Sequence, residues 1–358
     1  MVVEKIILRN YRNYDYLSLE FSPKLNIIVG ANGAGKTNIV ESIQYLSLAR
    51  SFRTQESTDL IKKGCQFATI EARVVENTSK KDIVAILTAN TKKISCNSNQ
   101  IKKISDLSKL VNVIVFEPKD ALMFKQSPLV RRNFLDINLS KKSPLYLDAL
   151  ITYERLLKER NKLLKDDEPN KIQIDVVTSQ LVKVSKTIDE HRIKYINDLN
   201  QIITKVTSQL SGENDNVRII YEPFIELNDD YEEQCTRAYE RAYESDVKHK
   251  VTSVGVHRED YSMILNDKDI SCYGSQGENR LAVIALKLSP YFLIEEREKR
   301  PIIVLDDVMS ELDDTHKERL ISFLRKFEQV FITSTSINVK NASIYEVNKN
   351  QKVTRRNS

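Results

Sequence analysis

The sequence predicts an α/β fold that is interrupted by a mostly helical insertion. Three observations lead to this prediction. Short apolar runs of strand length occur near both ends of the chain, at residues 25–29 and 302–305. The first run precedes a glycine-rich turn and then a helical spacing of apolar residues over 38–48. Between the two ends, apolar residues recur at intervals of three, four and seven over 146–210, which is typical of amphipathic helices.

The glycine-rich turn is the most specific motif in the chain. Its residues fit the pattern of a glycine, any four residues, and then Gly-Lys-Ser/Thr. In a strand–loop–helix context, such a loop points backbone N–H groups at phosphate oxygens, aided by the positive end of the helix. Only 8 glycines occur in the chain, and three of them lie here. The expected nucleotide-contacting residues are Gly30, Ala31, Asn32, Gly33, Ala34, Gly35, Lys36, Thr37 and Asn38.

Individual side chains in and beyond this loop have expected roles. Lys36 is expected to reach the β- and γ-phosphates, and Thr37 to bind Mg²⁺. The distant apolar strand ends in Asp306 and Asp307. In hydrolases with a phosphate loop, the first such acid helps to hold Mg²⁺ and the second polarises the attacking water. We therefore assign Asp306 to the metal and Asp307 to the water, with Lys36 as the third catalytic residue.

Composition restricts the class of protein. The 358 residues are 41% hydrophobic and 29% charged, with a net charge of +5, which permits nucleic-acid binding without requiring it. Four scattered cysteines favour a reducing compartment and argue against a zinc site. The start of the chain lacks the pattern of a secretion signal, and no apolar run is long enough to cross a membrane. A cytoplasmic protein with no membrane partner is expected.

Strand-like segments precede and follow the phosphate loop. Two expected strands, 2–8 and 17–21, are joined by a turn that contains Arg12. This arginine lies either in a solvated hairpin turn or near a nucleotide phosphate, and the sequence allows both. Further expected strands cover 67–75, 83–88, 111–116 and 329–335, and the polar end of the last suits a γ-phosphate sensor. Nearby lysine pairs (Lys92-Lys93 and Lys102-Lys103) are either solvated strand edges or DNA contacts.

The insertion is expected to contain a helical hairpin. One helix over 146–165 leads through a polar turn to a second helix of some 35 residues that ends at Gly212. A helix over 231–248 follows, and strands are expected at 251–256 and 261–265. Basic residues of the first helix are either a solvated face or a DNA-facing row (Arg155, Lys158, Arg160, Lys162 and Lys165). The expected boundaries are 1–120 and 246–358 for the nucleotide-binding lobe and 121–245 for the inserted helical lobe.

Several motifs together resemble one family. Ser275-Gln276-Gly277 at a helix start, the acid-tipped strand and Ser310-Glu311-Leu312-Asp313 are similar to the signature motif, Walker B strand and D-loop of ABC-type ATPases. Other stretches resemble the RecF family of bacterial recombination proteins within this SMC-like group, and they span nearly the whole chain: Ser51-Phe52-Arg53, Pro128 with Arg131-Arg132 and Phe134-Leu135-Asp136, Gly255 with His257-Arg258, and Phe331-Ile332-Thr333. Glu278-Asn279, Val256 and Glu259 depart from the family pattern.

The resemblance implies a mechanism. It implies an ABC-type head with a mixed β-sheet, in which Ser275, Gln276, Gly277 and Asp313 contact the ATP of a partner subunit. The chain would then form a homodimer with ATP and Mg²⁺, and it would be a slow, DNA-stimulated ATPase that uses hydrolysis as a switch. It would act as a clamp on single-stranded and duplex DNA at gaps and junctions, without sequence specificity. RecR and RecO are the implied partners, and RecA loading and SOS induction the implied processes.

Other classes fit less well. Transporter ATPase subunits place the signature about a hundred residues after the phosphate loop, whereas Lys36 and Ser275 are about 240 residues apart here. An SMC or Rad50 head carries a coiled coil of hundreds of residues, far longer than this hairpin. A non-hydrolysing scaffold would not need both Asp306 and Asp307, and a small-molecule kinase would not need the signature segment.

Overall fold

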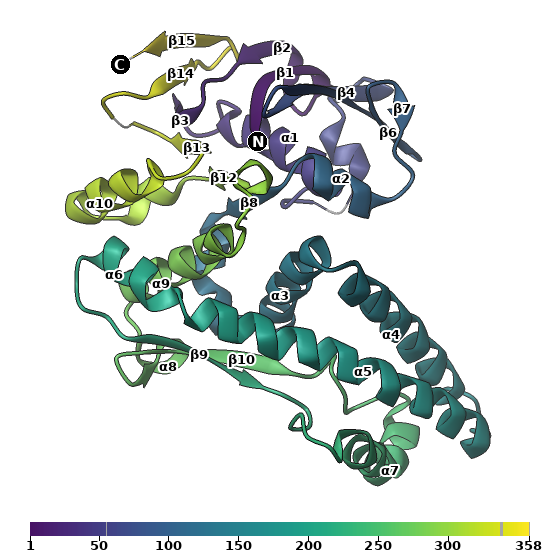
Figure 1. The fold of residues 1–358 in the computed structure, drawn as a ribbon. Coiled ribbons are helices and arrows are strands. Elements are labelled where there is room, and N and C mark those ends of the chain that lie inside the picture. Colours follow the sequence, from purple (N-terminus) through teal and green to yellow (C-terminus); the bar gives the residue numbers. More distant parts are fainter. Residues whose placement is uncertain (55, 337–338, 358) are drawn as a thin grey trace. The chain divides into compact units, whose positions relative to one another are not determined.

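The computed structural model describes residues 1–54, 56–336 and 339–357 and divides into two compact units. The first unit consists of Met1–Ala121, Lys205–Asn214 and Arg280–Ser358. The second consists of Leu122–Thr204 and Asp215–Asn279. Figure 1 labels the helices and strands of both units.

The first unit contains two six-stranded sheets. One is antiparallel with the order β2-β1-β4-β5-β6-β7, and the other has the order β15-β14-β3-β13-β12-β8. In the second sheet β14, β3, β13, β12 and β8 run parallel, and β15 pairs antiparallel with β14. The strands are β1 (Val2–Tyr11), β2 (Tyr14–Glu20), β3 (Lys24–Gly30), β4 (Phe67–Glu76), β5 (Ser79–Thr88), β6 (Lys92–Cys96), β7 (Asn99–Gln100), β8 (Val113–Phe116), β12 (Ile302–Leu305), β13 (Gln329–Ser334), β14 (Ser343–Val347) and β15 (Val353–Asn357).

Burial explains the difference between the two sheets. All residues of β12 and β13 are buried, as in parallel strands that are covered on both faces. Burial largely alternates along β4, as in a strand with one face toward the core. One hydrophobic core joins both sheets and helix α1, with Ile43, Ile70 and Phe331 among its members. The other helices of this unit are α2 (Ile104–Leu110), most of α6 (Ile203–Ser211), most of α9 (Gln276–Leu288) and α10 (Asp314–Leu324), with α1 at Lys36–Leu48.

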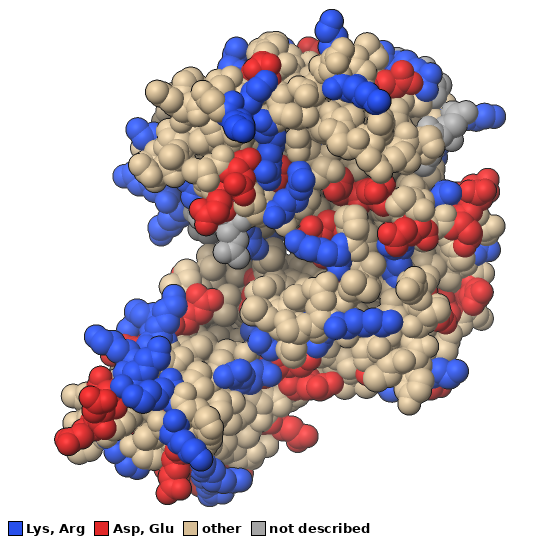
Figure 2. Space-filling model, turned by 180° about the vertical axis from the view of Figure 1, so that it is seen from behind, with Lys and Arg blue, Asp and Glu red and all other residues tan. Residues whose placement is uncertain are grey.

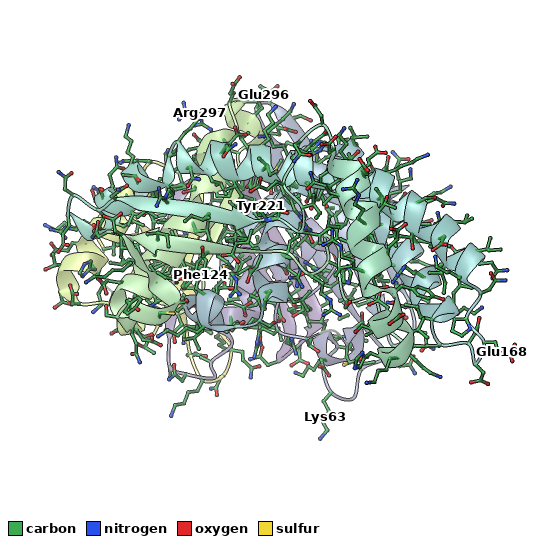
Figure 3. The ribbon with its side chains drawn as sticks, turned by 90° about the horizontal axis from the view of Figure 1, so that it is seen from below. Lys63, Phe124, Glu168, Tyr221, Glu296 and Arg297 are labelled. Carbon is green, nitrogen blue, oxygen red and sulfur yellow. The ribbon has the colours of Figure 1, made fainter. Side chains whose placement is uncertain are left out.

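The second unit is mostly helical. Helices α4 (Pro144–Leu163) and α5 (Lys171–Asn200) form the expected hairpin, whose turn carries Glu168 (Figure 3). The Ser143 hydroxyl accepts a hydrogen bond from the Tyr146 N–H at the start of α4, so the helix begins at a side-chain cap. The remaining elements are α3 (Pro128–Lys142), α7 (Tyr231–His249), α8 (Ile270–Tyr273) and an antiparallel sheet of β9 (Val217–Glu222), β10 (Asp260–Leu265) and β11 (Lys268–Asp269).

Two expected elements of the insertion differ from the prediction. The long second helix is interrupted after Asn200, whose side chain pairs with both backbone groups of Ile219 in β9; α6 then runs to Ser211, beside the expected stop at Gly212. The expected strand at 251–256 is irregular, since the backbone N–H groups of Thr252 and Ser253 donate to the side chains of Asn161 and Asp246 instead of to a neighbouring strand.

Arg160 does not belong to the row of solvated or DNA-facing basic residues that the sequence predicts on the first helix of the hairpin. Its side chain is 1% exposed and is neither solvated nor free to contact DNA. Its guanidinium donates to the Asp246 carboxylate over 2.7 Å and to the hydroxyls of Thr178 and Thr252. A buried guanidinium needs such partners because its desolvation is otherwise uncompensated. Arg160 therefore ties α4 to α7 and to the segment after it.

The division into units differs from the expected boundary at residue 246. Residues 246–279 group with the helical unit, because β10 pairs with β9 along its whole length. Arg131 in α3 adds a bidentate ion pair to Asp260 of β10, with both N–O distances at 2.7 Å. The short segment Lys205–Asn214, expected in the helical lobe, groups with the two-sheet unit instead.

Candidate nucleotide site

The phosphate loop connects β3 to α1, as the sequence predicts. The backbone is left-handed at Gly33 (φ 79°) and at Gly35 (φ 107°), which is the N-terminal cap residue of α1. Glycine adopts this conformation without steric cost. A Cβ atom added at Gly30 would lie 2.4 Å from the Val347 carbonyl oxygen. The three glycines therefore allow the curled loop and the close approach of β14.

Lys36 folds back over this loop. Its Nζ atom donates to the carbonyl oxygens of Gly30 (2.8 Å) and Ala31 (3.0 Å). The side chain is buried, which lowers the pKa of Lys36, whereas the carboxylates of Asp307 and Asp306 raise it. The ammonium is thus held at the mouth of the loop near both acids.

Thr37 and Asp306 lie side by side. The Thr37 hydroxyl is 2.9 Å from Asp306 Oδ1 and 3.2 Å from Oδ2, and the Thr333 hydroxyl donates to Oδ1 over 2.6 Å. Strand β13 pairs in parallel with both β3 and β12, so the carboxyl ends of these strands reach the same edge of the sheet. The Thr37 hydroxyl and the Asp306 carboxylate therefore lie close together, and both offer oxygen ligands of the kind that Mg²⁺ prefers.

Asp306 and Asp307 have different environments. Burial raises the pKa of Asp306, and the hydrogen bonds from Thr333 and Thr37 and the charge of Arg53 oppose this rise. Asp307 has a left-handed backbone (φ 48°), and its N–H donates to the Thr333 hydroxyl over 2.9 Å. Within the described part of the chain, Asp307 Oδ1 is buried and has no hydrogen-bond partner. Hydrogen bonds from two threonines therefore hold Asp306, while Asp307 keeps one carboxylate oxygen that accepts no hydrogen bond from the described residues.

Arg12 does not have a free guanidinium in this structure. Its Nε and Nη2 atoms form a bidentate pair with Glu41, at 2.8 and 2.5 Å, and its Nη1 donates to the Asp59 carbonyl over 2.8 Å. A contact between Arg12 and a phosphate stays a prediction. Sequence reasoning gave no role at this site to Glu41, nor to Arg53, whose guanidinium donates to the Asn38 side chain over 2.9 Å. The sequence signal for Glu41 was an acidic residue at a position that the helical spacing places on the buried face of α1.

The signature residues stand at the start of α9. The Ser275 N–H donates to Glu278 Oε2 (2.8 Å), and the Glu278 N–H donates to Ser275 Oγ (3.2 Å), which is a capping box. Gln276 is exposed, and a Cβ atom added at Gly277 would meet nothing within 4 Å. These residues belong to the second unit and the phosphate loop to the first. Their contact with a partner's ATP stays a prediction.

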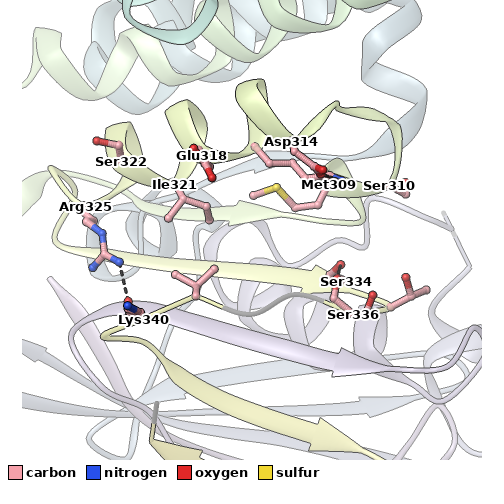
Figure 4. A pocket seen from close by; sticks show the side chains of 13 residues that line it. Met309, Ser310, Asp314, Glu318, Ile321, Ser322, Arg325, Ser334, Ser336 and Lys340 are labelled. Carbon is pink, nitrogen blue, oxygen red and sulfur yellow. Dashed lines mark hydrogen bonds and ion pairs between the residues drawn. The ribbon is translucent and has the colours of Figure 1, made fainter.

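Asp313 caps α10. Its carboxylate accepts the His316 N–H over 3.0 Å and pairs with the His316 ring over 2.5 Å, and both contacts lower the pKa of Asp313. Beside it, a pocket of about 760 Å³ opens between α10 and the polar end of β13. Figure 4 shows Met309 and Asp314 on one side of this pocket and Ser334 on the other.

The parallel sheet, phosphate loop and acid-tipped strand define a phosphate-loop ATPase fold of the ABC type, in its SMC-like group. A family model described as "RecF/RecN/SMC N terminal domain" matches residues 2–357. The structure of an Smc head bound to a domain of ScpA is similar in fold (TM-score 0.62, 16% identity, 99% of this chain and 97% of that chain).

Closer comparisons identify the branch of this group. A protein of Lachnospira eligens, named DNA replication and repair protein RecF, is 36% identical over 99% of this chain and 98% of its own length. The protein of that name from Halalkalibacterium halodurans is 34% identical over 97% and 98%. A solved structure of the recombination mediator RecF with ATPrS has a TM-score of 0.89 at 30% identity, covering 99% of this chain and 98% of that chain. The chain belongs to the RecF family of DNA replication and repair proteins.

The helices of the structure do not match the requirements of a bilayer. Within residues 1–54, 56–336 and 339–357, none combines the length and the apolar character that would allow it to span a membrane.

Proposed function

We propose that this protein is a slow, DNA-stimulated ATPase whose ATP-bound homodimer clamps DNA during recombinational repair. The observation that carries the proposal is the contact of Thr37 and Thr333 with Asp306, because it joins the phosphate loop to the acid-tipped strand. A solved structure of RecF with ATP in the RecFOR pathway is similar over 99% of this chain, at 30% identity and a TM-score of 0.88.

The residues of the first unit then have distinct roles. The loop N–H groups and Lys36 bind the nucleotide phosphates and offset their negative charge. Thr37 and Asp306 would hold Mg²⁺, which would supply positive charge to neutralise the phosphates. Asp307 would orient the attacking water with its carboxylate and accept the proton. The polar end of β13 would sense the γ-phosphate.

The second subunit completes the site in this proposal. A capped helix start with an uncrowded glycine, as at Ser275–Gly277, is suited to approach phosphate oxygens. Because one chain carries one phosphate loop and one signature, two-fold pairing would place two ATP molecules between two subunits. Asp313 would contact the partner's nucleotide from the D-loop. ATP then favours the dimer because its γ-phosphate touches both subunits, and hydrolysis removes that link.

DNA, RecR and RecO are the proposed macromolecular partners. The support comes from the names of the relatives and from the similar RecF structure, which belongs to the RecFOR pathway. Lys and Arg side chains gather near the end of the α4–α5 hairpin in Figure 2, with acidic side chains among them. Contacts of such cations with DNA phosphates are insensitive to sequence and sensitive to salt. The proposed clamp acts in the cytoplasm at gaps and duplex junctions, where it assists RecA loading and SOS induction.

Light scattering tests the proposed dimer. The protein is measured without nucleotide, with ADP and with ATP, beside Lys36→Met and Ser275→Arg variants. We expect ATP alone to double the mass and each substitution to abolish that change. DNA binding should show the same nucleotide dependence. A mass that stays at one subunit with bound ATP and added DNA would rule out the clamp. A transporter subunit is not favoured, since the relatives that match over nearly the full length are DNA repair proteins.

A further inference from the structure

Glu41 is a buried carboxylate in α1 with several donors around it. Its side chain is fully inaccessible to solvent. It accepts two hydrogen bonds from Arg12, one from the Ser51 hydroxyl over 2.5 Å and one from the Tyr11 hydroxyl over 3.3 Å. A buried carboxylate needs such donors and a cation in place of the water that it loses on burial. The Arg12–Glu41 pair therefore connects α1 to the turn between β1 and β2.

Ser51 connects Glu41 to the loop after α1. While its hydroxyl donates to Glu41, its oxygen accepts the backbone N–H groups of Arg53 (2.9 Å) and Thr54 (3.2 Å). Lys119 adds a second attachment, because its Nζ donates to the Phe52 carbonyl over 2.9 Å. The conformation of this loop thus depends on the carboxylate beneath it.

The loop places Arg53 at the nucleotide site. The Arg53 guanidinium donates to Asn38 Oδ1 over 2.9 Å, and Asn38 directly follows Thr37. Another of its contacts is with Glu41, at 3.9 Å. Its positive charge also reaches Asp306, where it acts to lower the pKa of the carboxyl group. The Arg53 side chain is 45% exposed, so it is accessible to a ligand at this edge of the sheet.

We propose that Glu41 is a positioning residue of the nucleotide site, which holds the Ser51–Thr54 loop so that Arg53 contacts the phosphates of a bound nucleoside triphosphate. This inference rests on the proposed ATP site and extends it to residues outside the phosphate loop. Arg12 supports the Ser51–Thr54 loop through Glu41, because two of its guanidinium nitrogens donate to the Glu41 carboxylate.

A double-mutant cycle tests the proposal. Dissociation constants for ATP are measured for the wild-type protein, Glu41→Gln, Arg53→Ala and the double variant. Since the neutral amide of the Glu41→Gln variant lacks the charge that organises the loop, we expect each single change to weaken ATP binding about tenfold. The double variant should bind ATP no more weakly than Arg53→Ala alone, because both changes remove the same contact between Arg53 and the phosphates. Arg53→Lys should restore part of the affinity.

Controls separate this role from a general effect on folding. Glu76→Gln is the matched control, since Glu76 pairs with Lys81 in the same unit and lies outside the nucleotide site. If Glu41→Gln does not fold, Ser51→Ala takes its place, because it cuts the link to the loop and leaves the Arg12 pair intact. Unchanged affinity in the folded variant, or losses that add to that of Arg53→Ala, would overturn the inference. If the wild-type protein binds no ATP, the proposed function itself fails.

Discussion

Thr37 and Asp306 are 269 residues apart in the sequence, yet the Thr37 hydroxyl lies 2.9 Å from a carboxylate oxygen of Asp306. The contact exists because β3 and β12 both pair in parallel with β13 and end at the same edge of the sheet. The helical unit and several strands lie between the two residues in the chain. The site is therefore assembled by sheet topology from two distant segments.

Loss of the Thr37 hydroxyl should impair turnover more than binding. Thr37→Val keeps the branched shape of the side chain but removes one oxygen donor from the expected Mg²⁺ site. We expect ATP hydrolysis to fall about 10- to 100-fold, with a smaller loss of nucleotide affinity. Steady-state hydrolysis and equilibrium binding are measured at several Mg²⁺ concentrations. Thr88→Val, at the end of β5, is the control, and an unchanged rate in Thr37→Val would contradict the metal assignment.

Asp307→Asn should separate ATP binding from hydrolysis. Asparagine tolerates the left-handed backbone at this position and keeps the side-chain volume, but it is a poor proton acceptor. We expect the hydrolysis rate to fall by about 100-fold or more while ATP binding persists, and we expect the ATP-bound dimer to last longer. Rapid-quench hydrolysis and light scattering measure the two effects. Asp314→Asn, at an exposed position in α10, should behave like the wild-type protein; normal turnover in Asp307→Asn would remove Asp307 from the mechanism.

Two glycines should respond differently to alanine. At Gly30 an added Cβ atom would collide with the Val347 carbonyl, and backbone atoms of β14 would have to move. We expect Gly30→Ala to cost about 2–4 kcal/mol and to lower the melting temperature by several degrees. At Gly277 the added atom meets no neighbour, so Gly277→Ala should melt like the wild-type protein and weaken only the ATP-dependent dimer. Differential scanning calorimetry and light scattering compare the two, and a large drop in melting temperature for Gly277→Ala would conflict with this geometry.

Asp189 should make the stability of the helical unit depend on pH. Burial and the neighbouring Glu259 raise the pKa of Asp189 to about 8, although the Tyr231 hydroxyl donates to it. Arg192 forms its ion pairs with Glu259 and Asp136, and the hydroxyls of Tyr221 and Tyr231 donate to Asp189. The folded state therefore holds a proton that the unfolded state releases near its ordinary pKa of 3.8.

The sign of the effect follows from this difference. The stability that protonated Asp189 contributes is complete below about pH 4 and is lost as the pH rises through about 8. Thermal unfolding between about pH 6 and pH 9 should show a declining melting temperature. Asp189→Asn carries no titrating proton and should flatten that decline, whereas Asp175→Asn, an exposed change in the same helix, should not. Identical pH profiles for the wild-type protein and Asp189→Asn would show that Asp189 is ionised in the folded state.

Local sequence patterns predicted the elements near the nucleotide site well. The expected strand at 25–29 and helix at 38–48 correspond to β3 and α1, and the expected strand at 329–335 corresponds to β13. The prediction failed where side chains compete for backbone groups. Asn200 ends α5 by pairing with β9, and Asp246 and Asn161 replace the partner of the expected strand at 251–256. The spacing of apolar residues along the chain cannot predict such contacts, because the competing side chains come from other elements.

The sequence by itself determined the phosphate loop. Its curled backbone depends on left-handed conformations that glycine adopts freely, so the pattern and the local structure are nearly the same information. It also indicated the family, because several motifs with the family spacing extend along nearly the whole chain. The prediction that Asp306 binds the metal rests on the acid-tipped strand, which is itself a local pattern.

Only the tertiary structure decided which distant side chains meet. Arg160 lies in the same run of basic residues as its exposed neighbours. It is buried because it pairs with Asp246, which is 86 residues away in the sequence. The contacts of Glu41 with Arg12 and Ser51 likewise join three segments around α1. The physical reason is that burial and ion pairing depend on which elements pack together. The order of strands in the sheet and the packing of helices set that arrangement, and the spacing of residues along the chain does not.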